Sequence, residues 1–239
     1  MRLSAPIYQL KRRARLMARD EGIPLHRAQD RIAASEGFSA WSLLAARASE
    51  AGDVGPILPR LADGDMLLIA ARPGQGKTRI ALQLLLDAAR EGRRSVLFSL
   101  EYSEREAADR FHALSRRSPD PSPNPLPEIM TSDGICAYYI VGHLAGSPRG
   151  TVAVIDYLQI LDQQRTKPPL STQMEVLQAF ARTTGVILAV VSQIDRSYEP
   201  QAAPVPGLSD LRLPNPIPPG SFSKACFLHA GEVRFQNLI

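Results

Sequence analysis

The segment from Ala71 to Thr78 has the residue types and spacing of a phosphate-binding loop. It reads ARPGQGKT and fits the pattern GxxxxGK[ST], except that alanine replaces the first glycine. In such a loop the backbone N–H groups cradle phosphate oxygens, the lysine places a positive charge on the β- and γ-phosphates, and the threonine hydroxyl ligates Mg²⁺. The alternative is a glycine-rich turn that only reverses the chain. The residues expected to bind a nucleotide, with Thr78 also as a metal ligand, are Arg72, Pro73, Gly74, Gln75, Gly76, Lys77, Thr78 and Arg79.

Two carboxylates follow apolar runs farther along the chain. Asp156 ends the run VAVID, as expected for an acid that holds Mg²⁺ through water; the alternative is a turn-forming aspartate. Glu101 follows the apolar run 96–100, at the end of a strand where ligands bind in open α/β sheets. It would orient and deprotonate an attacking water, and the alternative is an acid at the entry of the next helix.

Strand-sized apolar runs alternate with helical patterns over residues 56–239. Their near-continuous apolarity predicts an α/β core, a mostly parallel sheet covered by helices on both faces. Ser132 or Asp133 is expected to cap a helix that runs to about Ala145, and prolines predict long loops over 119–127 and 200–219. The expected strands are 66–71, 95–100, 129–131, 151–157, 186–192, 225–228 and 233–235.

Residues 1–52 predict a small extension of three short helices, followed by a linker at 51–56. Ser39 is expected to cap the third helix, and Trp41 to lie in its core. The run Lys11–Arg19 carries five cations. Its two interpretations are the solvated face of an amphipathic helix and a tether for nucleic-acid phosphates.

Composition excludes several classes of protein. The 239 residues include 28 Lys and Arg against 24 Asp and Glu, giving a net charge of +4, and arginine greatly outnumbers lysine. This bias is expected either from phosphate recognition or from a GC-rich genome. No apolar run approaches the roughly 18–20 residues of a membrane span, and no secretion signal is evident. Two distant cysteines make a disulfide scaffold or a zinc site a poor expectation, so we expect a cytoplasmic protein.

Five ordered blocks within residues 61–212 resemble the motifs of DnaB-type replicative helicases, which are RecA-like ATPases. The blocks are GDMLLIAARPGQGKT, FSLEYSEREAADRF, VIDYLQIL, VVSQIDR and LSDLR. The resemblance implies that Lys77 and Thr78 bind phosphates and Mg²⁺, and that Asp156 is the second metal-binding residue. It also implies that Glu101 is the catalytic base and that Gln193 reports the state of the γ-phosphate to DNA-contacting loops.

The same resemblance implies ATP and Mg²⁺ as cofactors, single-stranded DNA as a partner, and a homo-oligomer, with the hexamer as the family's form. It implies DNA-linked work of the helicase type, in a plasmid or mobile element. The alternative is a non-motor, ATP-dependent regulator or clamp that switches a partner. Arg165, Lys167 and Arg196 would contact DNA, although a solvated basic loop is an equal interpretation for the first two.

One motif of the family is not found. The helicases carry a Lys-x-Arg pair that reaches the ATP of the neighbouring subunit, and no such pair follows LSDLR. Without a trans-acting arginine, worth about 10³–10⁵ in rate, a slow ATPase is expected. The substitutes considered are Arg212, Lys224 and Arg234.

Overall fold

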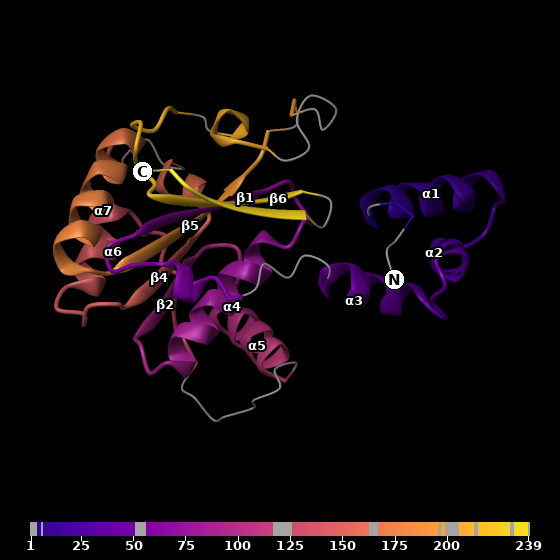
Figure 1. Ribbon diagram of the computed structural model, residues 1–239, viewed down its shortest axis with the longest axis horizontal. Helices are drawn as coiled ribbons and strands as arrows, with labels where there is room; N and C mark the ends of the chain where they lie inside the picture. The colour runs from indigo at the N-terminus through magenta and orange to yellow at the C-terminus, as the bar shows by residue number, and fades with distance from the viewer. Residues whose placement is uncertain are drawn as a thin grey trace.

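The computed structural model describes residues 4–5, 7–50, 56–116, 126–162, 167–195, 197–198, 206–212, 215–229 and 232–238. Within these residues, seven strands form one sheet in the order β3-β2-β4-β5-β1-β6-β7, and only β7 runs antiparallel to its neighbour (Figure 1). The mostly parallel α/β fold expected from the sequence is confirmed. The strands are β1 Met66–Ala71, β2 Ser95–Ser99, β3 Glu128–Met130, β4 Val152–Asp156, β5 Ile187–Gln193, β6 Lys224–His229 and β7 Glu232–Asn237.

Helices cover both faces of this sheet. Helices α4 and α5 pack on one face, and α6 and α7 pack on the other. The described part of the chain contains no helix with the length and apolarity to cross a membrane. The helices are α1 Ile7–Asp20, α2 Leu25–Ser35, α3 Trp41–Glu50, α4 Lys77–Arg90, α5 Glu104–Ser115, α6 Ala137–Leu144 and α7 Leu170–Thr184, with short 3₁₀ turns at Leu58–Arg60, Leu158–Asp162 and Leu208–Asp210.

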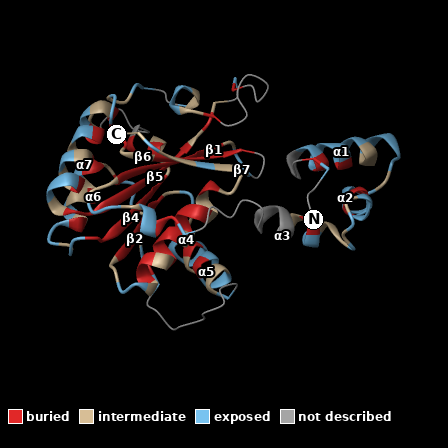
Figure 2. Cartoon of the chain, in the orientation of Figure 1, coloured by how far each residue is buried: buried red, intermediate tan, exposed pale blue. Residues whose placement is uncertain are grey.

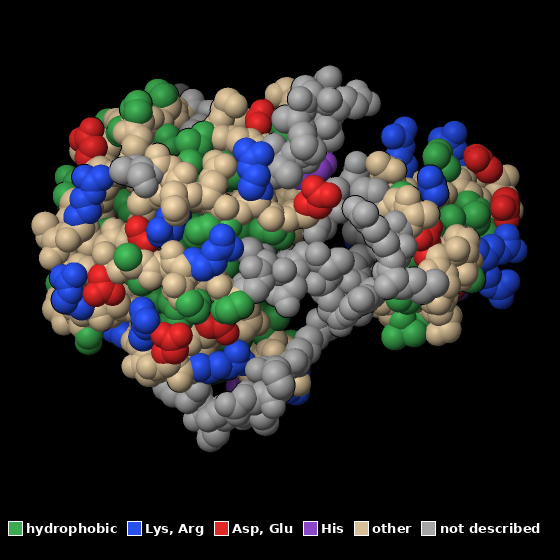
Figure 3. Space-filling view, in the orientation of Figure 1, with side chains coloured by type: hydrophobic (Ala, Val, Ile, Leu, Met, Phe, Trp, Pro, Cys, Tyr) green, Lys and Arg blue, Asp and Glu red, His purple; other side chains and the backbone are tan. Residues whose placement is uncertain are grey.

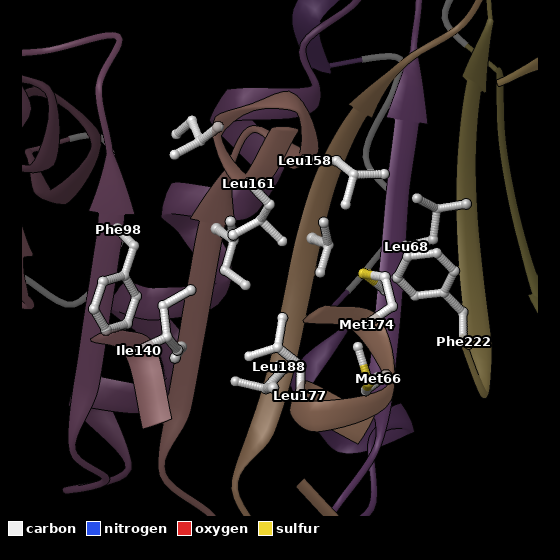
Figure 4. Packing of buried hydrophobic residues seen from close by; sticks show 14 of the residues in the cluster. Met66, Leu68, Phe98, Ile140, Leu158, Leu161, Met174, Leu177, Leu188 and Phe222 are labelled. Carbon is white, nitrogen blue, oxygen red and sulfur yellow. The ribbon is translucent and has the colours of Figure 1, made fainter. Parts of the chain in front are cut away.

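Alternate residues of each central strand face opposite sides of the sheet. In β1, Leu68 joins the core beneath α6 and α7, whereas Leu67 and Ile69 join the core beneath α4 and α5. The first of these cores contains Phe98 and Met174 (Figure 4). The central strands are buried along their length (Figure 2). Burying each large apolar side chain contributes about 1.5–3 kcal/mol, and the helices on both faces allow strands with almost no polar residues to be buried on both sides.

Two predicted helix caps are wrong. Helix α6 begins at Ala137 rather than after Ser132 or Asp133, because the Ser132 hydroxyl accepts the N–H of Gly134 and forms a turn there. Helix α3 begins at Trp41, whose N–H is accepted by Asp30 of α2, so the cap is supplied by a neighbouring helix and not by Ser39. Most of the predicted proline loop at 119–127 lies outside the described residues.

Helices α1 to α3 pack on one another around an apolar cluster of their own. Leu10 and Ala14 of α1 meet Ile32 of α2 and Leu44 of α3, and Trp41 lies partly buried against them. We call residues 4–50 the N-terminal module. The predicted boundary between this module and the core remains a prediction.

The amide of Gln173 on α7 joins three segments beside β4. Its side chain is fully buried, accepts the N–H of Ala137 at 3.0 Å, and donates to the carbonyl oxygens of Leu161 and Pro168, each at 2.7 Å. Leu161 and Pro168 flank residues 163–166, which follow the 3₁₀ turn after β4. The Gln173 side chain therefore links Leu161 and Pro168 to the first residue of α6, Ala137.

We expect Gln173→Met to lower the free energy of unfolding by about 2–4 kcal/mol. The variant keeps the side-chain volume but leaves one buried N–H and two carbonyl groups unpaired, and each such group costs about 1–3 kcal/mol before relaxation. Gln178→Met on the same helix is the matched control, because its exposed amide makes one hydrogen bond, to Gly220. Urea unfolding measures both. Equal stability of the two variants would contradict the structural role of Gln173.

Candidate nucleotide-binding site

The expected phosphate-binding loop connects the end of β1 to the start of α4. Gly74 and Gly76 have φ angles of 77° and 91°, in the left-handed region that favours glycine. A Cβ atom at either position would meet nothing within 4 Å, so the loop faces open space. Gly76 is the N-cap of α4, and the free N–H groups of the first turn therefore follow it directly. Lys77, only 8% exposed, is the first residue of the helix.

The register of the sheet brings the ends of four strands to one edge. Ala71 of β1 lies beside Gln193 of β5, and Ser99 of β2 lies beside Asp156 of β4. Glu101 follows Ser99 by two residues. The loop and the carboxylates predicted from separate parts of the sequence thus share the carboxyl edge of the sheet, where open α/β folds bind their ligands.

Asp156 is a buried carboxylate, and among the described residues no donor meets either of its oxygens at hydrogen-bond geometry, although the Thr78 hydroxyl lies close enough to affect its pKa. Burial raises its pKa to about 6, the charge of Glu101 adds to the shift, and the Lys77 ammonium and Thr78 hydroxyl oppose it. A buried acceptor pair of this kind has a cost that a bound cation relieves. Carboxylate and hydroxyl oxygens are the ligands that Mg²⁺ prefers, so Asp156 and Thr78 fit that ion.

Glu101 is exposed and is not used as a helix cap. Helix α5 has its own capping box, in which the hydroxyl of Ser103 accepts the N–H of Glu106 and the Glu106 carboxylate accepts the N–H of Ser103. The backbone N–H of Glu101 donates to the Ser99 hydroxyl at 3.1 Å, which ties the residue to the end of β2. The alternative interpretation of Glu101, an acid at the entry of the next helix, is therefore not needed, because Ser103 and Glu106 cap α5.

Two residues beside these carboxylates were missed by sequence reasoning. The guanidinium of Arg110 lies 4.3 Å from the ring centroid of Tyr102. Burial raises the pKa of Tyr102, Arg110 opposes this shift, and the charges of Asp156 and Glu101 add to it. Arg110 also opposes the raised pKa of Asp156. Arg110 lies on α5, whereas the phosphate-binding loop precedes α4. The sequence indicates its position only through the spacing of eight residues between Tyr102 and Arg110.

The later blocks of the resemblance are hydrogen-bonded to the first. The N–H of Ile194 donates to the carbonyl of Ala71 at 3.1 Å, and the N–H of Arg212 donates to the carbonyl of Gln193 at 2.8 Å. The amide of Gln159 donates to the carbonyl of Arg212 at 2.7 Å. These hydrogen bonds hold the segments around Ala71, Gln193 and Arg212 together at the carboxyl edge of the sheet.

Arg72 is held by the segment that follows β5. Its guanidinium donates to the carbonyl of Tyr198 and lies 5.4 Å from the centre of the Tyr198 ring, which meets His229 edge to face. Burial lowers the pKa of His229, and the charge of Arg72 adds to this effect. No sequence pattern groups these residues, because the three lie in separate segments.

The residues predicted to contact DNA have different placements. The ammonium of Lys167 donates to the carbonyl oxygens of Ile135 and Ile160, at 2.9 and 3.0 Å, so it joins two loops. Arg165 and Arg196 lie outside the described residues, and the DNA contacts remain predictions.

One of the possible substitutes for the arginine finger, Lys224, pairs with Asp65 at 3.5 Å. It lies where the parallel strands begin, at the edge of the sheet opposite the phosphate-binding loop.

The sheet order and the loop between β1 and α4 define the RecA-like P-loop ATPase fold. Two solved structures share it. One is an ATPase domain, with 24% identity, a TM-score of 0.53 and coverage of 71% of this chain and 70% of that one. The other is a DnaB-like replicative helicase described with its interactions with primase, with 20% identity, a TM-score of 0.58 and coverage of 93% and 66%.

Sequence comparisons point to one family. The family model of the DnaB-like helicase C terminal domain matches residues 53–118. A probable plasmid replicative DNA helicase of Chlamydia muridarum is 28% identical over 180 residues, 64% of this chain and 40% of that protein. The replicative DNA helicase DnaB of Mycoplasma pneumoniae is 26% identical over 188 residues, 63% and 39%. The likeness to the C-terminal domain of DnaB-type replicative helicases is thereby confirmed, over a region that spans about 40% of the length of these relatives.

We expect Asp156→Asn to stabilise the nucleotide-free protein above pH 6. The pKa of Asp156 is about 6 in the folded protein and near 3.8 in the unfolded chain. The free energy of unfolding therefore falls as the pH rises from about 3.8 to 6, because the folded protein disfavours the ionised carboxylate. Above pH 6 the full loss of stability remains. The advantage of the variant should therefore grow by roughly 1–2 kcal/mol between pH 5 and pH 7.5. Urea unfolding at both pH values measures it. An advantage that shrinks as the pH rises would contradict the raised pKa.

Proposed function

We propose that this chain binds Mg·ATP at the carboxyl edge of its sheet and hydrolyses it. The observation that supports this most strongly is the buried Asp156 carboxylate, whose charge is influenced by Lys77 and Thr78 at the start of α4. Among the described residues no donor meets either of its oxygens at hydrogen-bond geometry, whereas a purely structural aspartate would be expected to have its oxygens paired. A buried carboxylate of this kind beside a glycine loop supports a Mg²⁺·nucleotide site.

Each residue has a separate role in the proposed reaction. The N–H groups of residues 74–78 and the Lys77 ammonium hold the β- and γ-phosphate oxygens. Thr78 and Asp156 would hold Mg²⁺, Asp156 through water, and the bound ion would supply neutralisation of the phosphate charge. Glu101 takes the proton from a water aligned with the γ-phosphorus. Gln193 senses the presence of the γ-phosphate and passes it to the segments hydrogen-bonded to it.

We further propose that turnover is linked to DNA, as in a helicase or a DNA-dependent ATPase, including one of a plasmid or mobile element. The relatives named above are replicative DNA helicases, one of them a plasmid protein. Single-stranded DNA is the partner that this likeness supports, and assembly into a homo-oligomer such as a hexamer would allow an arginine to act in trans.

A second candidate function is a non-motor regulator that switches a partner according to its nucleotide. The placement of Lys224 favours this function, because Lys224 is paired with Asp65 and lies at the edge of the sheet opposite the carboxyl ends of the strands.

A steady-state ATPase assay with and without single-stranded DNA separates the two functions. Stimulation of several fold supports the motor, and an unchanged rate supports the regulator.

We expect Glu101→Gln to retain nucleotide binding and to lower the ATPase rate about 10²–10⁴-fold, because it removes the proton acceptor but keeps the shape of the side chain. Lys77→Ala should abolish turnover by weakening the hold on the phosphates. Glu104→Gln, an exposed acid in the first turn of α5, is the control for loss of charge in this region and should turn over normally. Normal turnover by Glu101→Gln would show that Glu101 is not the base.

A further inference from the structure

The whole net charge of the protein resides in its N-terminal module and the residues before it. Residues 1–50 hold nine of the 28 Lys and Arg but only five of the 24 Asp and Glu, which accounts for the net charge of +4. Residues 51–239 contain equal numbers of cations and anions. The excess positive charge is therefore carried outside the nucleotide-binding core, and the nucleotide site does not explain it.

On α1 these cations form a stripe on the side away from the apolar cluster. Lys11, Arg15 and Arg19 follow one another four residues apart, about 6 Å along the helix axis, and Arg12 lies beside them. All four side chains are exposed, whereas Leu10 and Ala14 on the opposite side are fully buried. We call these four residues the α1 stripe. Figure 3 shows Lys and Arg side chains over the helices of the module.

The stripe differs from two other cations of the module, Arg13 and Arg31, which lie near acids. Among the described residues none of the four makes an ion pair, whereas Arg31 pairs with Glu21. Hydrogen bonds from Ser4 lower the pKa of Glu36, and the nearby charge of Arg13 adds to this. Like charges four residues apart destabilise a helix. The sequence thus keeps four repelling cations on one face of α1, whereas Arg13 and Arg31 lie near acids.

We propose that the α1 stripe is a second nucleic-acid site, which binds the phosphodiester backbone without regard to sequence and independently of ATP. Three of its four cations are arginines, whose planar guanidinium matches phosphate oxygens in a bidentate way. The choice of nucleic acid among polyanions rests on the DNA-linked function proposed above. A membrane surface fits less well, because Leu16 is the one large exposed apolar side chain described on this helix.

Fluorescence anisotropy of the full chain with a labelled single-stranded oligonucleotide, without nucleotide and over 50–200 mM salt, tests the proposal. Each phosphate contact with a single strand contributes about 0.7 to the slope of log affinity against log salt. The double variant Arg15→Gln/Arg19→Gln should lower this slope by about 1.4 and weaken binding at 0.1 M salt by about 25-fold. Replacing all four residues by Gln should lower the slope by about 3 and weaken binding on the order of 10²-fold or more.

The matched control is Arg13→Gln/Arg31→Gln, which removes two cations of the same module that lie near acids. It should leave the slope almost unchanged. Arg15→Lys/Arg19→Lys should retain the wild-type slope, because the charges remain. Glutamine has nearly the helix propensity of arginine and lysine, and circular dichroism of each variant checks that α1 is intact.

Equal losses in the two double variants, or no loss in the stripe variant, would overturn the proposal. Stripe-dependent binding to vesicles containing phosphatidylserine, without stripe-dependent binding to DNA, would overturn it in favour of a membrane surface. This test of the α1 stripe can be distinguished from a test of the proposed ATP hydrolysis. Stripe-dependent DNA binding by a protein without ATP turnover would refute the proposed function alone, and turnover by a protein without stripe dependence would refute only the second site.

Discussion

The buried carboxylate of Asp156 is the constraint around which the nucleotide site is organised. A charge in this position is costly, and the Lys77 ammonium, the Thr78 hydroxyl and Arg110 offset part of that cost. The glycine loop follows β1 at the same edge of the sheet, and the charge of Glu101 adds to the raised pKa of Asp156. The fold thus holds a buried carboxylate whose cost a divalent cation would relieve.

The rest of the core serves to keep this edge in register. Parallel pairing of β1, β2, β4 and β5 aligns four strand ends within one or two residues of each other, and apolar packing on both faces fixes that alignment. Hydrogen bonds from Ile194 to Ala71 and from Arg212 to Gln193 then connect the strand that ends in Gln193 to the loop and to the last block. These hydrogen bonds fix the position of the last block relative to the loop.

The core and its motifs could be predicted from the sequence because their signals are local. The strands are apolar runs of the right length, and the loop has a spacing that backbone geometry demands. The caps of α3 and α6 could not be predicted, since Asp30 caps α3 from another helix and the Ser132 hydroxyl forms a turn before α6. The contacts of Arg72 with Tyr198 and of Arg110 with Tyr102 depend on which loops the fold brings together, and the prediction that Lys167 contacts DNA took no account of the two carbonyl groups it reaches.

Asp156 and Thr78 are proposed to hold the metal of a Mg·ATP site. Isothermal titration of the protein with a non-hydrolysable ATP analogue, with Mg²⁺ and with EDTA, tests this assignment when wild type and Asp156→Asn are compared. We expect Mg²⁺ to tighten binding at least about tenfold in the wild type and much less in the variant. Equal tightening by Mg²⁺ in both proteins, or nucleotide binding that is indifferent to Mg²⁺, would contradict it.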